Sequence, residues 1–499
     1  MKQNNTSRHV RLIAALLLIV TVFGLVLTAC KTSGDGNAST TTKTTTASGG
    51  DATPTDSNRQ LVESLYGDYD FNAYDFKILG MASGSWWYGS FLGDTFNEIW
   101  YETDSADPLE SAIYTRNRRT EDLLNITISP VWTQNAGETT DKVRQALDTG
   151  ETDYDLCLGC LSESMNCAQE GYMANILDVE TIDVTHPWWD QNLIDAYTIF
   201  NDRLYILSGH ANVYDDMSIL FFLFNKDMAE QYGIGDLYHY VDENNWTIDT
   251  IVELSKKTFH DNGDGNTANS TYTTNQSGGF FHGFNLPMTE PDEDGIPQLT
   301  VTRENHVNAA AKLYNSVIEG EFTRPADLGS TDDELFANNQ LFLYSVITCQ
   351  LNRYRNLQVD FGLMPFPKLD SQQSKYSHFV NWAFFSCYFI PTFNQDLDRT
   401  GVIFETMSGY STETVYNTTF ETLMGYDSKL LRDNRSKDML DIVMNSRLFD
   451  YSIMGLGEIG KIYTMDNWGS FMYESVVDTY KRSAMTALKK IVRNFEAIE

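Results

Sequence analysis

The residues best suited to chemistry in this sequence lie in a short polar segment, residues 210–218, between two apolar runs. Asn212, Asp215 and Asp216 place one amide and two carboxylates close together there. These groups accept hydrogen bonds from hydroxyl groups, and paired carboxylates also perform glycoside hydrolysis. Adjacent aspartates do not put two carboxyl groups on opposite sides of a bond to be cut. The segment therefore favours ligand binding over catalysis.

A second set of candidate residues is aromatic. Trp86, Trp87 and Tyr88 stand together in a glycine-rich segment, residues 83–89, which follows a predicted strand at residues 76–79. Aromatic ring faces stack well on the C–H faces of sugars. Two adjacent tryptophans on a loop are poorly suited to lying both in a core. We expect at least one ring to face a ligand, and packing between lobes is the alternative.

Motifs for catalysis and metal binding are missing from the sequence. GxSxG, HExxH and the P-loop pattern do not occur, and the eight histidines are scattered, which predicts a protein that is not an enzyme and uses no cofactor. Cys157 and Cys160 form one CxxC pair without a second pair, and the nearest histidine is His186. Structural thiols or a single disulfide are therefore expected, and no metal site.

The order of predicted elements indicates how these residues are positioned. Strands and helices alternate in the first third of the chain, which predicts a parallel sheet with its ligand at the carboxyl ends of the strands. The predicted elements are a strand at 76–79, a helix at Pro108–Leu124, a strand at 125–128, a helix at 141–147 and a strand at 154–158.

A second α/β unit follows the polar segment. Residues 219–224 are six unbroken apolar residues, which suits a strand covered on both faces, as in a parallel sheet. Short helical patterns open near Asn225 and near Thr247, a plausible N-cap. Residues 210–218 are therefore expected to link two lobes and to act as a hinge, with Asn212, Asp215 and Asp216 facing the cleft.

Length, charge and composition are those of a large folded protein. The chain has 499 residues, too many for one ordinary core, so two lobes are the default. Its formal net charge of −34 argues against nucleic acid as a partner, because binding nucleic acid needs clustered cations. With 42% hydrophobic residues the chain is not globally disordered.

The N-terminus resembles that of bacterial lipoproteins. Lys2, Arg8 and Arg11 precede an apolar stretch at residues 12–29, and Leu-Thr-Ala-Cys at 27–30 is similar to a lipobox. The resemblance implies cleavage before Cys30, a diacylglycerol on its thiol and anchoring to the membrane. An uncleaved membrane span or an ordinary secretory signal are the alternatives. Residues 1–29 are thus read as a signal peptide and 30–69 as the lipidated cysteine with a Ser/Thr/Gly-rich tether.

The body resembles the extracellular solute-binding proteins of ABC importers, family 1, the sugar-binding branch. The resemblance is carried by Leu-Tyr at 204–205, Asn-Lys at 225–226, Trp-Thr at 246–247, Pro-Trp-Trp at 187–189 and Asp-Phe-Gly-Leu-Met-Pro-Phe-Pro-Lys at 360–368. It implies an α/β, two-lobed periplasmic-binding-protein-like fold of type II, with discontinuous lobes joined by hinge segments. Lobe 1 would comprise residues 70–210 and 372–405, and lobe 2 residues 211–371 and 406–499.

The resemblance also implies a site, a ligand and partners. Residues 379–390 would re-enter lobe 1 as one buried strand carrying Trp382 near the crossing, and Trp468 occupies a late position where relatives stack an aromatic ring on sugar. The ligand would be a sugar or oligosaccharide and the partners ABC permease subunits. A peptide or other polar solute, a surface-anchored carbohydrate-active enzyme and a purely adhesive lipoprotein are the alternatives.

Overall fold

A computed structural model of the chain describes these residues: 54–82, 96–260, 273–275, 277–318, 322–325, 330–381, 383, 385–423, 431–463 and 473–498. Cys30 and the aromatic residues Trp86, Trp87, Tyr88, Trp382 and Trp468 lie outside them. The predicted roles of these six residues therefore stay predictions.

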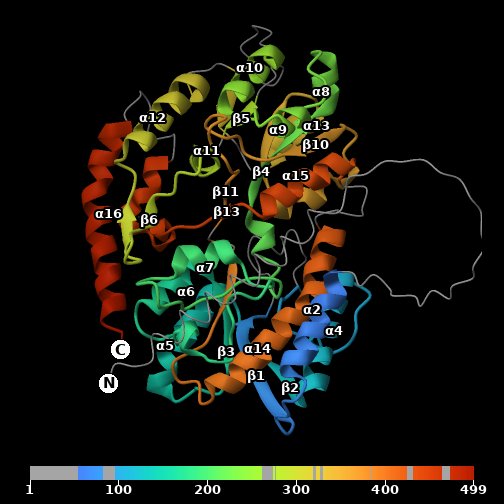
Figure 1. Cartoon of the computed structure of the whole chain (residues 1–499). Coiled ribbons are helices and arrows are strands. Elements are labelled where there is room, and N and C mark those ends of the chain that lie inside the picture. The colour runs from blue at the N-terminus through green and yellow to red at the C-terminus, as the bar shows by residue number, and fades with distance from the viewer. Residues whose placement is uncertain are drawn as a thin grey trace, which may run out of the picture. The chain divides into compact units, whose positions relative to one another are not determined.

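The first lobe is built on a four-stranded sheet with the order β12-β3-β1-β2 (Figure 1). Strands β1 (Tyr74–Met81), β2 (Ile126–Thr133) and β3 (Leu156–Cys160) are parallel. This confirms the parallel sheet predicted from the alternating pattern. Strand β12 (Ser386–Phe389) returns from much later in the chain and pairs antiparallel with β3.

The helices of this lobe begin and end at local signals. Helix α4 (Pro108–Leu124) starts where the side chain of Asp107 accepts hydrogen bonds from the backbone N–H groups of Leu109 and Glu110, at 2.9 and 3.1 Å. It ends at Asn125, whose φ of 52° is left-handed. Helices α5 (Ala136–Thr149) and α6 (Leu161–Ala168) follow β2 and β3 and pack on β3.

The second lobe is built on a three-stranded sheet with the order β10-β4-β9. Its strands are β4 (Leu220–Asn225), β9 (Leu343–Ile347) and β10 (Phe361–Met364), and β4 pairs antiparallel with both neighbours. The prediction of a parallel sheet from the apolar run at 219–224 is therefore wrong. The apolar run indicates only that both faces of the strand are buried. This is also true of a central strand in an antiparallel sheet. Strand β10 ends directly before Pro365, because proline has no backbone N–H to donate to a strand ladder.

Residues 379–390 do not form one strand. Strand β11 (His378–Phe379) pairs parallel with β13 (Arg447–Leu448), and β12 pairs with β3 in the first lobe. Between them Asn381 donates its backbone N–H to the carbonyl of Ser218, at 2.7 Å. The apolar run is interrupted because the chain passes there from one sheet to the other.

Helix α14 (Leu397–Ser411) completes the first lobe by packing on α2 (Pro54–Tyr66) and α4. The predicted lobe limit between residues 405 and 406 falls inside this continuous helix, and the lobe limits as a whole stay a prediction. Glu405 on α14 is fully buried and accepts hydrogen bonds from the indole N–H groups of Trp188 and Trp189, at 2.8 and 3.3 Å. These two tryptophans therefore hold the core of the first lobe together.

The remaining elements belong to both lobes and to the connections between them. They are η1 (Ile176–Asp178), α7 (Gln191–Tyr197), η2 (Asp216–Ser218), α8 (Lys226–Gln231), α9 (Tyr238–Asp242), α10 (Ile248–Thr258), β5 (Thr273–Asn275), α11 (Ser277–Gly283), β6 (Thr289–Pro291), β7 (Pro297–Leu299), α12 (Glu304–Leu313), η4 (Tyr314–Ile318), β8 (Thr323–Pro325), α13 (Ser330–Ala337), η5 (Thr348–Asn356), η6 (Thr412–Tyr416), η7 (Thr419–Leu423), α15 (Asn434–Met444), η8 (Tyr451–Met454), η9 (Leu456–Tyr463) and α16 (Tyr473–Glu496). Of these, η6 and η7, for example, contact α4 of the first lobe. Within the described ranges, none of the helices has the length and apolar character needed to cross a membrane.

Candidate functional site

Three stretches of chain meet where the two lobes join: residues 208–219, 378–381 and 446–453. We call them the junction segments. Ile219 forms an antiparallel bridge with Val380, and β11 pairs with β13, so the three segments are linked by backbone hydrogen bonds. A movement of one lobe against the other would therefore change the positions of all three segments together.

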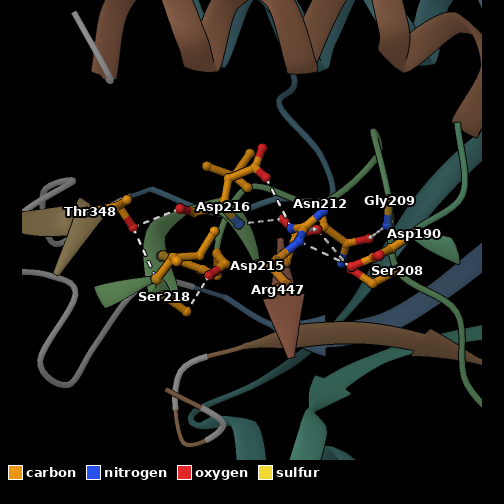
Figure 2. Close-up of polar contacts among 12 residues, drawn as sticks. Asp190, Ser208, Gly209, Asn212, Asp215, Asp216, Ser218, Thr348 and Arg447 are labelled. Carbon is orange, nitrogen blue, oxygen red and sulfur yellow. Dashed lines mark hydrogen bonds and ion pairs between the residues drawn. The ribbon is translucent and has the colours of Figure 1, made fainter. Parts of the chain in front are cut away.

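The first junction segment contains the predicted residues Asn212, Asp215 and Asp216, and the structure brings them into one polar cluster (Figure 2). All three are buried, with 2% or less of their surface exposed. The amide N–H of Asn212 donates to the Ser386 hydroxyl at 3.0 Å, and the Asp215 carboxylate accepts from the Ser208 hydroxyl at 2.9 Å. These groups already serve the protein itself, and their role in binding a ligand stays a prediction.

Arg447 is the centre of this cluster. Its Nε lies 3.1 Å from the Asp190 carboxylate, and its Nη1 lies 3.2 and 3.5 Å from those of Asp216 and Asp215. Asp190 also begins α7 by accepting a hydrogen bond from the Asn192 backbone N–H at 3.0 Å. We call Arg447 with these three aspartates the Arg447 cluster. It joins the third junction segment to the first, and both to the first lobe.

The Arg447 cluster holds more acid than base. Burial raises the pKa of Asp215 to about 6. Burial and the neighbouring Asp215 carboxylate raise the pKa of Asp216 well above its usual range. Burial alone would lower the pKa of Arg447, but the three surrounding carboxylates raise it, so the guanidinium stays charged. Arg447, whose side chain is 11% exposed, is thus the only cation among the described residues within ion-pair distance of Asp215 and Asp216.

Glu98 and Arg116 hold the middle of the first junction segment from the first lobe. One carboxylate oxygen of Glu98 accepts hydrogen bonds from the backbone N–H groups of Val213 and Tyr214, at 2.6 and 2.9 Å, and from the Ser386 hydroxyl at 2.9 Å. Arg116 is fully buried and donates to the carbonyl of Ala211 at 3.3 Å. Burial raises the pKa of Glu98 to about 7.

His210 is partly buried on the first-lobe side of the junction. Its ring stacks on that of Tyr416 at 4.0 Å, and its Nδ1 lies 2.8 Å from the Thr412 hydroxyl. Burial, followed by the charge of Arg447, lowers the pKa of His210 to about 3. The imidazole is therefore neutral at physiological pH.

A small cavity, about 20 Å³ in volume, lies at the junction between the lobes. Leu161, which directly follows the carboxyl end of β3, contributes from the first lobe, and His282 on α11 contributes from the second. The other lining residues come from the second and third junction segments: Phe379, Val380, Leu448, Phe449, Asp450, Ser452 and Ile453. Ligands of open α/β sheets bind at the carboxyl ends of the parallel strands, and this cavity is at that edge.

A larger hollow, about 980 Å³ in volume, lies at the opposite edge of the first sheet. It is lined by residues 169–175 and 202–203 together with Thr392 and the end of α16. Because β12 runs antiparallel to β3, with Phe389 opposite Cys157, Thr392 marks the amino end of β3. Size alone would favour this hollow, but its position at the amino edge does not suit a ligand site of this fold.

The end of α16 forms a further connection between the lobes. Along its length α16 packs on η9 and β7, whereas its last turn contacts the first lobe. The ring of Phe495 stacks on that of Tyr205 at 5.4 Å, and the Arg203 guanidinium donates to the carbonyl of Ile498 at 3.1 Å. Separation of the lobes would have to break or bend this contact.

The five cysteines of the described ranges are buried, and the Cys160 thiol donates to the carbonyl of Ala383 at 2.9 Å. Cys157 and Cys160, the predicted structural pair, both lie in strand β3. In the same ranges, no three His, Cys, Asp or Glu residues are grouped so that they could hold a metal ion.

Sequence reasoning missed Arg447, Asp190, Glu98 and His282. Each is a single charged or polar residue that forms no recognisable motif with its neighbours in the sequence. Glu98 and Val213, for example, are 115 positions apart. The only local signal was at Asp190, which precedes a short helical pattern as N-caps do.

Comparison with solved structures identifies the fold. The galacto-N-biose/lacto-N-biose I-binding protein of an ABC transporter from Bifidobacterium longum, in complex with lacto-N-biose, matches with a TM-score of 0.55 and 11% identity over 86% of this chain and 99% of that one. An ABC substrate-binding protein from Listeria monocytogenes in complex with cycloalternan matches with a TM-score of 0.51 and 12% identity over 84% and 99%. An extracellular solute-binding protein family 1 from Alicyclobacillus acidocaldarius matches with a TM-score of 0.50 and 9% identity over 83% and 99%.

A search of protein-family models and a search of curated proteins with the sequence found no match. At 9 to 12% identity the structural likeness shows the fold. The chain thus has the α/β, two-lobed fold of the sugar-type substrate-binding proteins of ABC importers, as the sequence resemblance predicted.

Proposed function

We propose that this protein is a lipid-anchored extracytoplasmic receptor that binds a sugar or oligosaccharide between its two lobes and delivers it to an ABC importer. The observation that carries the proposal is the cavity at the carboxyl edge of β3, because residues of both lobes and of two junction segments line it. The structural neighbours in complex with lacto-N-biose and cycloalternan support a carbohydrate as the ligand class.

Ligand binding in such a receptor works by shifting a conformational equilibrium. A cavity of about 20 Å³ has room for one water molecule and not for a sugar ring, so the lobes have to part to admit the ligand. The ligand then favours the closed state through contacts with both lobes. The apolar lining residues, such as Phe379 and Phe449, suit the C–H faces of a sugar.

The binding function predicts stabilisation by sugar. We expect the unfolding temperature of the purified body to rise on addition of lacto-N-biose, maltotetraose or cycloalternan. A sugar at 100 times its Kd would add about 2.7 kcal/mol to the free energy of unfolding. Trp86→Ala and Trp468→Ala are expected to weaken binding about tenfold each if these rings stack on the ligand. Differential scanning fluorimetry and titration calorimetry measure both effects.

Tyr69→Ala provides the matched control, because Tyr69 is an aromatic residue with 42% of its surface exposed. It is expected to bind sugar as the wild type does. A sugar panel without any shift would contradict the proposed function. Binding that survives in both tryptophan variants would contradict the assignment of these two rings and leave the function standing.

The lipid anchor is supported by the apolar stretch at residues 12–29 and by the lipobox-like residues 27–30. Expressed in a bacterium grown with radiolabelled palmitate, the full chain is expected to carry the label and to sediment with membranes. Cys30→Ala is expected to lose the label and to leave the membrane fraction, whereas Cys349→Ala retains both properties. Label on the Cys30→Ala protein would contradict acylation at this residue.

A further inference from the structure

The polar residues that line the interlobe cavity differ in how many of their hydrogen-bonding atoms are already paired within the protein. Six of the nine lining residues are apolar, and His282, Asp450 and Ser452 are polar. The Asp450 carboxylate accepts hydrogen bonds from the backbone N–H groups of Ser452 and Met288, at 2.7 and 2.6 Å. Both of its oxygens are therefore engaged in holding η8 and the start of β6.

His282 is held in one defined state. Its Nδ1 lies 2.8 Å from the carbonyl oxygen of Gly278, one turn earlier in α11. A carbonyl oxygen can only accept, so Nδ1 carries the hydrogen and Nε2 of the neutral ring carries a lone pair. The ring meets Phe379 nearly edge to face, with 4.8 Å between centroids and 74° between planes. No donor among the described residues forms a hydrogen bond with Nε2.

Burial keeps this imidazole neutral. It lowers the pKa of His282, and the Asp450 carboxylate opposes that effect only in part. At physiological pH the ring therefore offers an acceptor at Nε2 and no second donor. A bound ligand that covered this acceptor without pairing with it would cost free energy, whereas a ligand hydroxyl placed there removes the cost.

We infer that Nε2 of His282 is the hydrogen-bond acceptor that the second lobe offers to a hydroxyl group of the bound ligand, so that this residue contributes to ligand specificity. The inference rests on the proposed function and deepens it. A ligand with a donor at this position pairs with Nε2 when the lobes close. A ligand that carries hydrogen or an ether oxygen there leaves Nε2 buried and unpaired, and such mismatches discriminate strongly between analogues.

The test combines protein variants with ligand analogues. The sugar that binds most tightly among lacto-N-biose, maltotetraose and cycloalternan is compared with its single-deoxy analogues, by calorimetry, on the wild type and on His282→Leu. We expect His282→Leu to weaken binding of the parent sugar about tenfold, the size of one hydrogen bond in a closed site. One deoxy analogue should bind the wild type about tenfold more weakly and lose nothing further on His282→Leu.

Two further variants distinguish the loss of the hydrogen-bond acceptor from a general effect of the substitution on the fold. His282→Gln can place an amide oxygen near the position of Nε2 and is expected to bind within about threefold of the wild type. His239→Leu changes a histidine on α9, outside the cavity lining, and is expected to bind as the wild type does. In the wild type, the ¹⁵N resonance of His282 Nε2 should move toward the protonated range when the sugar is added, an effect that a purely structural histidine would not show.

The outcomes separate the two levels of the proposal. Sugar binding that is equal in the wild type and in His282→Leu would overturn the role of His282 and leave the proposed function intact. The same holds if every deoxy analogue loses the same affinity on both proteins, or if the Nε2 resonance does not move. A panel in which no sugar binds the wild type would overturn the proposed function, and the role of His282 with it.

Discussion

Replacing Arg447 by methionine is expected to lower the free energy of unfolding by about 3 to 5 kcal/mol. The guanidinium lies within 3.5 Å of three buried carboxylates. Methionine keeps most of the volume but removes the charge, so Asp190, Asp215 and Asp216 are left buried beside one another. Chemical denaturation at pH 8, followed by tryptophan fluorescence, measures the loss.

Arg435→Met is the matched control for this prediction. Arg435 lies on α15 and pairs with Asp242 at 2.7 Å, but both side chains are more than a third exposed, so its loss is expected to cost less than about 1 kcal/mol. The damage of Arg447→Met should also shrink at pH 5, because the carboxyl groups of Asp215 and Asp216, whose pKa values burial raises, become protonated there. Equal stability of Arg447→Met and Arg435→Met at pH 8 would show that the cluster does not hold the junction together.

Local signals account for what the sequence predicted correctly. The limits of α4 follow from Asp107 as the N-cap, a proline at the first turn and Asn125 at the end, all of which are neighbours in the chain. The parallel order of the first sheet follows from alternating strands and helices, because a helical crossover returns each strand in the same direction. Such features need no knowledge of distant contacts.

Strand direction in the second lobe could not be predicted from the same kind of pattern. An unbroken apolar run such as that of β4 indicates that both faces of the strand are covered. It does not indicate the direction of the neighbouring strands. Those neighbours, β9 and β10, lie more than 110 residues away in the chain. The interruption between β11 and β12 escaped prediction for a related reason. Val380 and Phe385, on its two sides, are both apolar and buried, although β11 and β12 belong to different sheets.

The candidate site shows the same limit more strongly. Asn212, Asp215 and Asp216 stood out because they are adjacent in the sequence, and the structure does bring them together. Arg447, the partner of Asp215 and Asp216, lies more than 230 positions away, and nothing in its local sequence connects it to them. Ion pairs between residues far apart in the sequence thus stabilise the junction. The pattern of a single segment cannot predict such pairs.

Glu98 makes a second strong prediction, which concerns pH. The pKa of its carboxyl group is about 7 in the folded protein, compared with a usual value of 4.5, because the group is buried. The folded state therefore binds a proton more tightly than the unfolded state does. Between pH 4.5 and pH 7 this group makes the protein less stable as the pH rises, and above that window the loss is complete.

Glu98→Gln is expected to remove this penalty. The glutamine amide oxygen can still accept the backbone N–H groups of Val213 and Tyr214, and no charge has to be buried. At pH 5 the variant should be more stable than the wild type by less than about 1 kcal/mol, whereas at pH 8 it should be more stable by up to roughly 3 kcal/mol. Denaturation curves at half-unit steps from pH 5 to pH 8 give the difference between the two proteins directly.

The difference curve isolates Glu98 because every other titrating group is common to both proteins. The Arg447 cluster contributes in the same direction, since the pKa of Asp215 is also raised, to about 6, and this part of the slope should remain in Glu98→Gln. Glu151→Gln, which changes an exposed carboxylate, should leave the wild-type slope unchanged. A Glu98→Gln protein that is less stable than the wild type at pH 8 would mean that the negative charge itself holds residues 213 and 214. The hydrogen bonds of Glu98 would then outweigh the cost of burying its charge.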